Sequence, residues 1–598
     1  MATSTTLLAS GLLRPRVLRG RGGLRAEAKR RKSREEDAER AEQRRTSEAV
    51  ARDGRLGGNE EESVETEQRQ EISPRRLTQD EIMAVKKQLR VHGSAPPAPQ
   101  PPPPPPEWAF PLLAGLTVTA SLAYVGYKFF ENKMPEVQKK LKEKSWRQES
   151  TGRLNEIMNE LRSMQTADVQ ARNLGDEGCS YVVEALAFND VCTAVDLSSN
   201  GIGSMGLLAL IESLKHNDVL NSINLNQNAG GDEGATAIAE FLATNYTIGS
   251  INLSSNGIGD EGAKALAEML KKNSTLTILE LNNNVIDYDG CVAIAEALVE
   301  NTTLSTFNMS GNYAGGLGAN VLAKALERNA GIVELRLSGN DLGNEGTKAL
   351  AEALEVHQGN LTSLDLGNNG IGLEGARAIA SYVEKCSSLT SLNLYMNDLG
   401  DEGCKLIVQA LKTNKTVTSL DLGGNNIGPK GMAAIADLLK DNDTIVTLEL
   451  GYNPAGPEGS KALAEALKFH GKVETLKMGW CKVGVEGAVP LADMLRYNNT
   501  ISTLDLRGNN MGDDGARAFA QSLKVVNEAL NNLDLGYNEI KDEGAFALAQ
   551  ALKANAEGAV ALLSLSSNYI TKLGAVALTE AVDIVHELGS GKDTTIVF

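Results

Sequence analysis

The feature that most constrains this chain is a motif of about 28 residues that recurs from about residue 166 to the end. In residues 250–281 a short alternating segment, INLSSN, runs into a Gly-Asp-Glu-Gly turn and then into a segment rich in Ala and Leu. A fixed period of this length is typical of a solenoid, in which a unit buries its apolar face only against its neighbours.

An asparagine closes the alternating segment of each unit and marks the period. The spacing is 28 residues, apart from small insertions before Asn369, Asn538 and Asn568, and Cys481 takes the same place once. The thirteen marker asparagines are Asn200, Asn228, Asn256, Asn284, Asn312, Asn340, Asn369, Asn397, Asn425, Asn453, Asn509, Asn538 and Asn568. We expect each amide to satisfy backbone groups in the turn after the strand, where losing a buried partner costs about 1–3 kcal/mol.

Each unit is predicted to hold one short strand and one helix. Ile251 and Leu253 alternate with polar residues, so they are expected to face the core of the strand layer. Asp260 is expected to cap the helix that it begins. The alanines of that helix allow it to approach the strands closely.

The motif resembles that of the leucine-rich repeat proteins, and its length is similar to that of the ribonuclease-inhibitor type. The resemblance implies an α/β fold for residues 166–598: a right-handed solenoid, or horseshoe, of about 14 to 15 repeats of 28 residues. A parallel β-sheet would form its concave face and helices its convex face. The resemblance also implies protein partners on the concave face, although a fold alone does not determine function.

Charge divides the chain into two parts. Residues 1–150 hold 28 Lys and Arg against 21 Asp and Glu, whereas the remainder holds 31 against 56. An acidic repeat body argues against nucleic acid as a partner, because a phosphate backbone requires a basic surface. The six cysteines have no metal-binding spacing and are predicted to be small buried residues in a reducing compartment.

The amino-terminal segment is predicted to be disordered. Residues 1–26 are rich in Ser, Thr, Ala, Leu and Arg, with no acidic residue before Glu27, which is typical of a plastid transit peptide. A mitochondrial transit peptide and a plain basic tail are the alternatives. We therefore interpret residues 1–50 as a transit peptide or basic disordered segment, and residues 51–106 as a disordered segment that ends in a proline-rich spacer.

Residues 108–128 are predicted to form one transmembrane helix, because residues 108–127 carry no charge and are enough to cross a bilayer. The lysines that follow predict a stromal repeat domain at the inner envelope or thylakoid membrane of a plastid. The outer envelope, with the repeats facing the cytosol, is the alternative. Residues 135–165 are predicted to form a juxtamembrane helix that caps the first repeat, and residues 594–598 a last strand.

No catalytic constellation is recognisable. The sequence has no HExxH, GxSxG or Walker A motif, and three of its five histidines lie at the helix ends of repeats, where we expect them to be exposed. Seven Asn-x-Ser/Thr sequences share that phase, and we interpret their asparagines as helix caps that adopt the left-handed conformation. We predict no catalytic residue, no cofactor and no metal ion, and therefore a protein that is not an enzyme.

The strand residues that point away from the core change character along the chain. They are small and polar in the early repeats, but aromatic and charged residues appear from the eighth strand. The predicted partner-binding residues are Tyr395, Met396, Asp421, Glu449, Tyr452, Lys477, Trp480, Asp505, Arg507, Asp534 and Tyr537. Exposed aromatic residues in one phase of nearby repeats indicate a protein-binding patch; chance scatter of packed side chains is the alternative.

These features predict a monomeric, membrane-anchored scaffold or adaptor that binds a protein partner. The chain is similar to the plant ribonuclease-inhibitor-like plastid proteins, which are associated with plastid development. Ran GTPase-activating proteins use repeats of the same type, so a regulator of a small GTPase is the alternative function. An innate-immune receptor is a third interpretation, but its nucleotide-binding module is missing from this sequence.

Overall fold

The computed structural model describes residues 152–598, except for residues 358, 525–527, 557 and 589–593. These residues belong to one compact unit, Ala120–Phe598, and the second unit, Met1–Thr119, lies outside the described residues. The segments predicted at residues 1–50, 51–106 and 108–128 also lie outside them.

Three-residue strands form one parallel sheet, in which each strand pairs with the strands before and after it in the sequence. The strands are β1 Thr166–Asp168, β2 Ala194–Asp196, β3 Ser222–Asn224, β4 Ser250–Asn252, β5 Ile278–Glu280, β6 Thr306–Asn308, β7 Glu334–Arg336, β8 Ser363–Asp365, β9 Ser391–Asn393, β10 Ser419–Asp421, β11 Thr447–Glu449, β12 Thr475–Lys477, β13 Thr503–Asp505, β14 Asn532–Asp534, β15 Leu562–Ser564 and β16 Thr595–Val597. In β4 and β5, Ile251 lies opposite Leu279, which is the same position of the next repeat.

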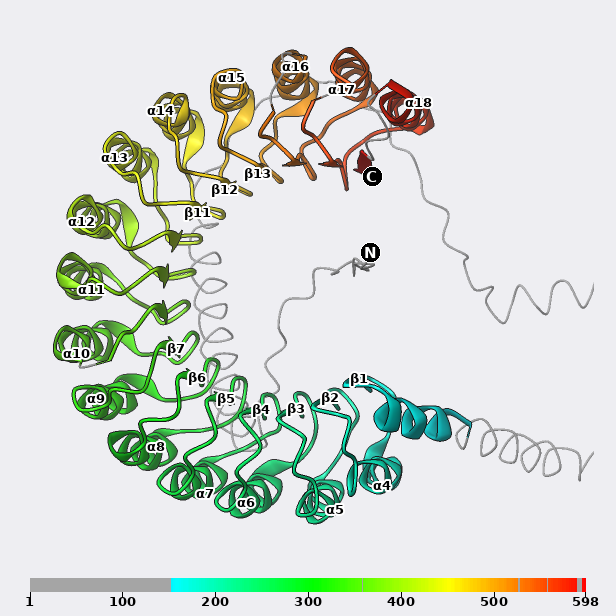
Figure 1. Cartoon of the computed structure of the whole chain (residues 1–598). Helices are drawn as coiled ribbons and strands as arrows, with labels where there is room; N and C mark the ends of the chain where they lie inside the picture. Colours follow the sequence, from blue (N-terminus) through cyan, green and yellow to red (C-terminus); the bar gives the residue numbers. More distant parts are fainter. Residues whose placement is uncertain (1–151, 358, 525–527, 557, 589–593) are drawn as a thin grey trace, which may run out of the picture. The chain divides into compact units, whose positions relative to one another are not determined.

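A helix follows each of the strands β1 to β15 and returns the chain to the next strand. The helices are α4 Gly175–Leu186, α5 Ser204–Leu214, α6 Gly231–Leu242, α7 Asp260–Leu270, α8 Tyr288–Glu300, α9 Gly315–Leu326, α10 Gly343–Val356, α11 Leu373–Lys385, α12 Gly400–Thr413, α13 Pro429–Leu439, α14 Gly456–Leu467, α15 Gly484–Met494, α16 Gly512–Leu523, α17 Asp542–Ala554 and α18 Lys572–Leu588. The strands line the inner side of the arc of repeats and the helices its outer side (Figure 1). The predicted α/β solenoid is therefore present in the described residues.

One continuous core lies between the strands and the helices. Ile251 of β4 and Leu253, just after this strand, are each 1% exposed, and Leu266 of α7 lies in the same core with no exposed surface. At the first repeat, residues 152–163 form a helix whose Ile157 and Leu161 are buried in the same core. The apolar face of each repeat is thus covered by the next element in the chain.

The fold class predicted from the sequence is wrong in including a transmembrane helix. Within residues 152–598, gaps excepted, no helix is both long and apolar enough to cross a bilayer. The expected span, residues 108–128, lies outside the described residues, so it rests on an uncharged sequence and not on a helix of the structure. Each described helix instead has one buried apolar face and one polar face, because it covers the sheet.

The prediction that Asp260 caps the helix that it begins is also wrong. The N-cap of α7 is Gly259, with no side-chain cap hydrogen bond. Asp260 Oδ1 instead accepts the backbone N–H groups of Asp287 and Gly290, at 2.8 and 3.0 Å, at the start of α8. Asp232 makes the equivalent bonds to Gly259 and Gly262, so a carboxylate caps the helix of the following repeat.

Asparagines near the helix ends, including most of those in the Asn-x-Ser/Thr sequences, form a second buried ladder, but Asn360 is exposed and does not share the predicted phase. Asn301 is 5% exposed, and its Nδ2 donates to Leu270 O at 2.8 Å while its Oδ1 accepts the N–H of Leu304. The predicted left-handed conformation is wrong here, because Asn301 has φ −81° and ψ 122°.

Two histidines replace asparagine in this second ladder, so the expectation of exposed helix-end histidines is wrong for His470. His470 is 9% exposed, and its Nε2 lies 2.8 Å from Asn442 O. His357 Nδ1 lies 2.8 Å from Leu326 O in the same way. These rings are packed into the ladder because an imidazole, like an amide, offers both a donor and an acceptor.

Candidate inner-face binding site

The turn after each strand fixes the backbone of the residue that precedes the marker position. This residue has a positive φ in repeat after repeat, for example 56° at Ser255, 60° at Tyr452, 60° at Trp480 and 55° at Tyr537. Bulky residues are uncommon in this left-handed region, where a side chain crowds the backbone. The surrounding repeat therefore imposes the conformation, and the same geometry projects the three aromatic side chains from equivalent points.

Four aromatic residues of the inner side form a contiguous row, which we call the aromatic row: Tyr395, Tyr452, Trp480 and Tyr537. The Tyr395 and Tyr452 ring centroids are 6.4 Å apart in an edge-on arrangement, and Tyr452 and Trp480 are stacked at 6.4 Å. Trp480 and Tyr537 are 5.6 Å apart. Tyr452 is 53% exposed and Trp480 40%, so the row presents a continuous apolar surface that the described residues leave uncovered.

Glycines between the aromatic residues allow the rings to lie against the backbone. A Cβ on Gly508 would stand 2.3 Å from the Trp480 ring, and a Cβ on Gly423 would stand 2.9 Å from Cδ2 of Tyr395. Met396 packs over Gly424 in the same manner, with its Sδ 2.4 Å from the position of a Cβ. Any larger residue at these positions would displace the side chain above it.

Charged residues lie beside the aromatic row. They occupy the last position of consecutive strands and point to the inner side; they are Asp421, Glu449, Lys477, Asp505 and Asp534. Each aspartate also fixes the turn after its strand: Asp421 Oδ1 accepts the N–H of Gly423 at 2.8 Å, and Asp534 that of Gly536 at 2.8 Å. The sequence thus places carboxylates in a row by using them as turn acceptors.

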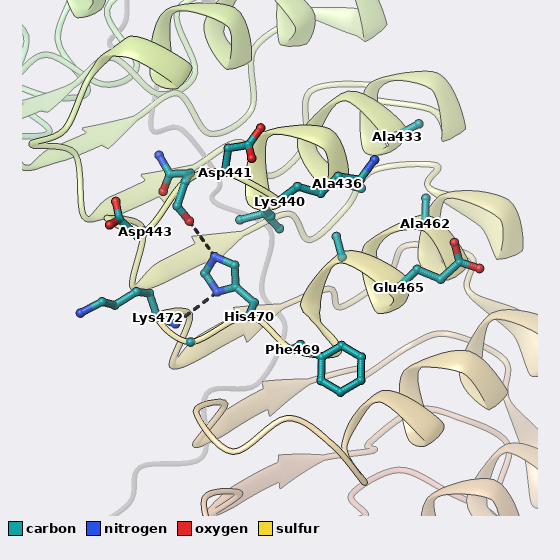
Figure 2. Close-up of a pocket in the computed structure, with 14 residues that line it drawn as sticks. Ala433, Ala436, Lys440, Asp441, Asp443, Ala462, Glu465, Phe469, His470 and Lys472 are labelled. Atoms are coloured by element: carbon teal, nitrogen blue, oxygen red, sulfur yellow. Dashed lines mark hydrogen bonds between the residues drawn. The ribbon is translucent and has the colours of Figure 1, made fainter.

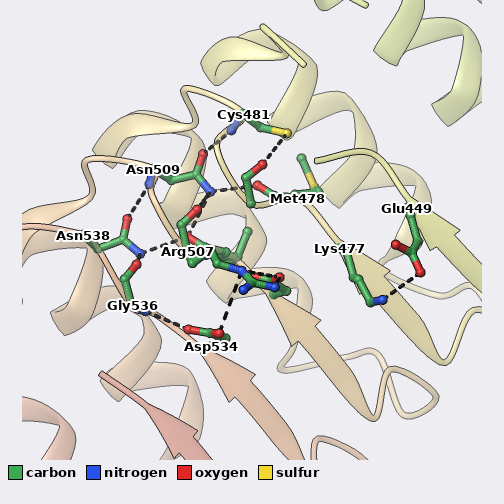
Figure 3. A network of polar contacts seen from close by, with 12 residues as sticks. Glu449, Lys477, Met478, Cys481, Arg507, Asn509, Asp534, Gly536 and Asn538 are labelled. Atoms are coloured by element: carbon green, nitrogen blue, oxygen red, sulfur yellow. Dashed lines mark hydrogen bonds and ion pairs between the residues drawn. The ribbon is translucent and has the colours of Figure 1, made fainter. Parts of the chain in front are cut away.

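Two cations partly neutralise this acidic row, as Figure 3 shows. Lys477 Nζ lies 2.7 Å from Glu449 Oε1. Arg507 donates from Nε and Nη2 to Asp505 Oδ2, at 2.8 and 2.5 Å, and its Nε lies 4.0 Å from Asp534. The four carboxylates of the row thus face two cations, so the row keeps a negative balance.

Asp421 is the carboxylate of the row that no lysine or arginine of the described residues approaches within ion-pair distance. Burial, together with the nearby Glu449, raises its pKa from an ordinary value of 3.8 to about 6. Burial likewise raises the pKa of the Tyr395 phenol, with the charges of Tyr452 and Asp421 adding to the effect. Asp421 and Tyr395 are therefore neighbours in a partly desolvated part of the surface.

The marker asparagines lie behind the row and hold its turns. Asn509 Nδ2 donates to Met478 O at 2.8 Å and to Leu506 O at 2.9 Å, while its Oδ1 accepts the N–H of Cys481 at 2.9 Å. Cys481 keeps the donor role, because its Sγ donates to Leu450 O at 3.2 Å. The hydrogen bonds of buried Cys481 and Asn509 thus fix the turn that carries Trp480.

A separate hollow of about 700 Å³ lies between α13 and α14, near the carboxy-terminal ends of these helices (Figure 2). Alanines and Phe469 line it, and buried His470 forms part of its floor. Phe469 is 79% exposed and meets Tyr497 edge-on at 5.8 Å, with Lys468 over the Tyr497 ring. This pair was not predicted from the sequence, although both residues directly precede the second ladder position in adjacent repeats.

The structure brings most of the predicted partner-binding residues together. The aromatic row and the charged residues beside it come from strands β9 to β14 and the turns after them. Met396 is 47% exposed and lies over Gly424, beside the row. The glycines under these side chains were missed: Gly423 belongs to a series of glycines that recurs two residues before the marker, and Gly424 and Gly508 stand one residue before it.

No group of three or more His, Cys, Asp or Glu in the described part of the chain is arranged to hold a metal ion. Five of the six cysteines are buried, and burial raises the pKa of Cys179, Cys291, Cys404 and Cys481 to about 12. These thiols are packed in the core and carry no thiolate at neutral pH.

Comparison with known proteins agrees with this architecture. The family model described as Leucine Rich repeat matches ten segments: residues 193–210, 245–267, 272–295, 329–351, 359–380, 385–408, 413–436, 472–492, 497–520 and 526–549. No curated protein matches the chain.

Two solved structures are among those that are similar. Leiomodin-1 Actin-Binding Site 2 (ABS2) is 32% identical, and the match covers 25% of this chain and 86% of that chain, with a TM-score of 0.22. A chain of the Rad7 and Elc1 complex in yeast is 12% identical, and the match covers 74% of this chain and 94% of that chain, with a TM-score of 0.40.

Proposed function

The chain is a leucine-rich repeat protein, and we propose that it is a non-enzymatic scaffold or adaptor that binds a protein partner on its inner face. The observation that carries this proposal is the aromatic row, in which four rings from different repeats meet at 5.6 to 6.4 Å and three of them, Tyr452, Trp480 and Tyr537, remain exposed. Such a surface gains free energy when a partner removes it from water.

The proposal includes two finer points. Helices α4 to α17 have 11 to 14 residues, and this length supports repeats of the ribonuclease-inhibitor type. A plastid location, as in the similar plant proteins, is favoured by the composition of residues 1–26.

The test needs a variant that removes the rings without straining the turn. Asn283 and Asn368 occupy the equivalent position in other repeats, with φ of 56° and 51°. Asparagine tolerates the left-handed region better than alanine does. The double variant Tyr452→Asn/Trp480→Asn is therefore preferable to alanine at these two positions.

The experiment is affinity capture with the full chain, followed by measurement of the affinity of each captured protein. We expect the double variant to lose a specific partner, with a Kd raised about tenfold or more. The control is Phe469→Ala/Tyr497→Ala, which removes an exposed aromatic pair at the ends of the outer helices. Equal retention of the partner by the unaltered chain and both double variants would contradict binding at the inner face. Stimulated GTP hydrolysis by a captured GTPase would instead support a function as regulator of a small GTPase.

A further inference from the structure

The acidic row contains its own example of how this surface holds a guanidinium group. Arg507 stands two residues after Asp505 and binds it from Nε and Nη2. Its Cγ lies 3.1 Å from the position of a Cβ on Gly479, so its stem crosses the backbone of the neighbouring repeat. Arginine suits this place because its planar head bonds a carboxylate while its stem covers apolar surface.

The equivalent place beside Asp421 lacks that arginine. Gly423 stands two residues after Asp421, where Arg507 stands after Asp505. The Tyr395 ring lies over Gly423 and closes one side of this place. Asp421 Oδ1 accepts the Gly423 N–H, whereas Oδ2 has no donor that the structure gives among the described residues.

The surrounding charges favour a cation at this place. Glu449 and Asp365 raise the pKa of Asp421, and Lys477 lowers it only in part because Lys477 is paired with Glu449. The chain from residue 151 onwards holds 31 Lys and Arg against 56 Asp and Glu. This charge would attract a basic partner over a distance and raise its rate of association.

We propose that the partner of the inner face presents an arginine, whose guanidinium binds Asp421 against the Tyr395 ring at the edge of the aromatic row. The Tyr395 ring supplies cation–π contact and the carboxylate a charge-assisted hydrogen bond. A lysine offers neither a planar head to stack nor a two-pronged donor, so arginine is preferred to lysine. This inference rests on the proposed function and adds the chemistry of the partner.

The test uses the full chain and three labelled peptides of equal length: hexaarginine, hexalysine and hexacitrulline. Fluorescence anisotropy would give each Kd at constant salt. We expect hexaarginine to bind about tenfold more tightly than hexalysine, and hexacitrulline to bind no better than hexalysine. Equal binding of the two charged peptides would overturn the inference.

Matched variants separate the site from the general charge of the protein. Asp421→Asn keeps the acceptor for the Gly423 N–H, as Asn393 does for Tyr395, and we expect it to reduce the preference for arginine to about twofold or less. Glu465→Gln removes the same charge from the outer helix α14 and should leave the preference unchanged. An equal loss in both variants would show binding by charge alone and would overturn the inference.

The pH profile supplies a second readout. Asp421 binds a proton as the pH falls through about 6, so the affinity of the unaltered chain for hexaarginine should fall there, and that of the Asp421→Asn variant should not. The groups that face Asp421 are Glu449, Lys477 and Asp365, together with the Tyr395 ring, which Tyr452 meets edge-on. A profile that is unchanged by Asp421→Asn would assign the titration to one of the other carboxylates and overturn the role of Asp421.

The failures of the two proposals are distinguishable. If a captured partner depends on Tyr452 and Trp480 but the peptides show no preference for arginine, the inner face binds protein by other chemistry and only the present inference falls. If the double variant Tyr452→Asn/Trp480→Asn keeps its partner, the proposed function falls, and if Asp421→Asn keeps the arginine preference, the present inference falls.

Discussion

At the scale of single residues, the marker position requires a side chain that donates a hydrogen bond and, in most repeats, one that also accepts a hydrogen bond. Asn369 Nδ2 donates to Leu337 O at 3.0 Å, and its Oδ1 accepts the N–H of Asn340 at 2.8 Å. Among the described residues, the buried Oδ1 of Asn425 has no hydrogen-bond partner, although its Nδ2 donates to Leu394 O at 2.8 Å. The thirteen marker residues are therefore not equivalent in their bonding.

This difference predicts that cysteine is tolerated better at position 425 than at position 369. A thiol replaces the amide donor, as Cys481 shows, but it is a weak acceptor. We expect Asn369→Cys to lower the free energy of unfolding by about 1 kcal/mol more than Asn425→Cys does. Urea denaturation would measure both, with the exposed Gln409→Ala of α12 as the control. Equal losses would contradict the unequal roles of the two amides.

The raised pKa of Asp421 predicts how stability depends on pH. Its value of about 6 in the folded protein exceeds the ordinary 3.8, so the folded state binds the proton more tightly than the unfolded chain does. The contribution of Asp421 to stability is therefore greatest below about pH 4 and is lost as the pH rises through about 6.

The variant Asp421→Asn tests this dependence, because the amide stays neutral. We expect it to raise the melting temperature relative to the unaltered chain at about pH 7.5 but not at about pH 4. Glu465→Gln is the control for removal of one negative charge. A gain of the same size at both pH values would show that burial does not penalise the Asp421 carboxylate.

At the scale of the element, several helices are capped by a side chain of the preceding repeat: α5, α7, α8, α11, α13, α17 and α18. The Asp260 carboxylate bonds the first turn of α8, and Asp401 bonds the N–H groups of Gly428 and Gly431 at the start of α13. The negative charge lies near the positive end of the next helix. Capping between repeats therefore couples these helices to the repeat before them.

This coupling predicts that Asp260→Ala weakens α8 rather than α7. We expect a loss of about 1 kcal/mol in local stability, measured by hydrogen exchange of peptides that cover the start of each helix. Glu261→Ala is the matched control, because Glu261 lies on the same turn but pairs with Lys264 in its own helix. Faster exchange at the start of α7 instead of α8 would contradict the assignment.

The alternation of strand and helix could be predicted because every repeat carries the same local signals. Ile251 and Leu253 show the strand period, and the glycine turn shows where the helix begins. The target of Asp260 could not be predicted, since its bond reaches 27 residues ahead into the next repeat. Burial of His470 was missed for the same reason: its partner, Asn442 O, belongs to the preceding repeat.

The inner-face site could be predicted in part. Its residues occupy corresponding positions in successive repeats, and such a recurrence is visible in the sequence. The contact of the Trp480 ring with Gly508 was not predicted, because it depends on the spacing between adjacent repeats and on a positive φ at Trp480. The binding role of these residues stays a prediction.

At the scale of the whole repeat body, each unit contacts only its neighbours, and the two ends are closed differently. The first repeat is covered by the helix at residues 152–163, in which Leu161 has no exposed surface. The last is covered by α18 and by β16, and Val585 of α18 is 3% exposed. In such an array stability is a sum of local terms, so damage at one end need not reach the other.

This architecture predicts that Leu161→Ala and Val585→Ala unfold opposite ends. Removing a buried leucine costs about 2–5 kcal/mol, and we expect Leu161→Ala to speed hydrogen exchange in β1 and α4 while β15 and α18 stay protected. Val585→Ala should do the reverse, and each variant serves as the control for the other. Faster exchange along the entire body in either variant would mean that the repeats unfold as one cooperative unit, and the inner-face site would then share the stability of both ends.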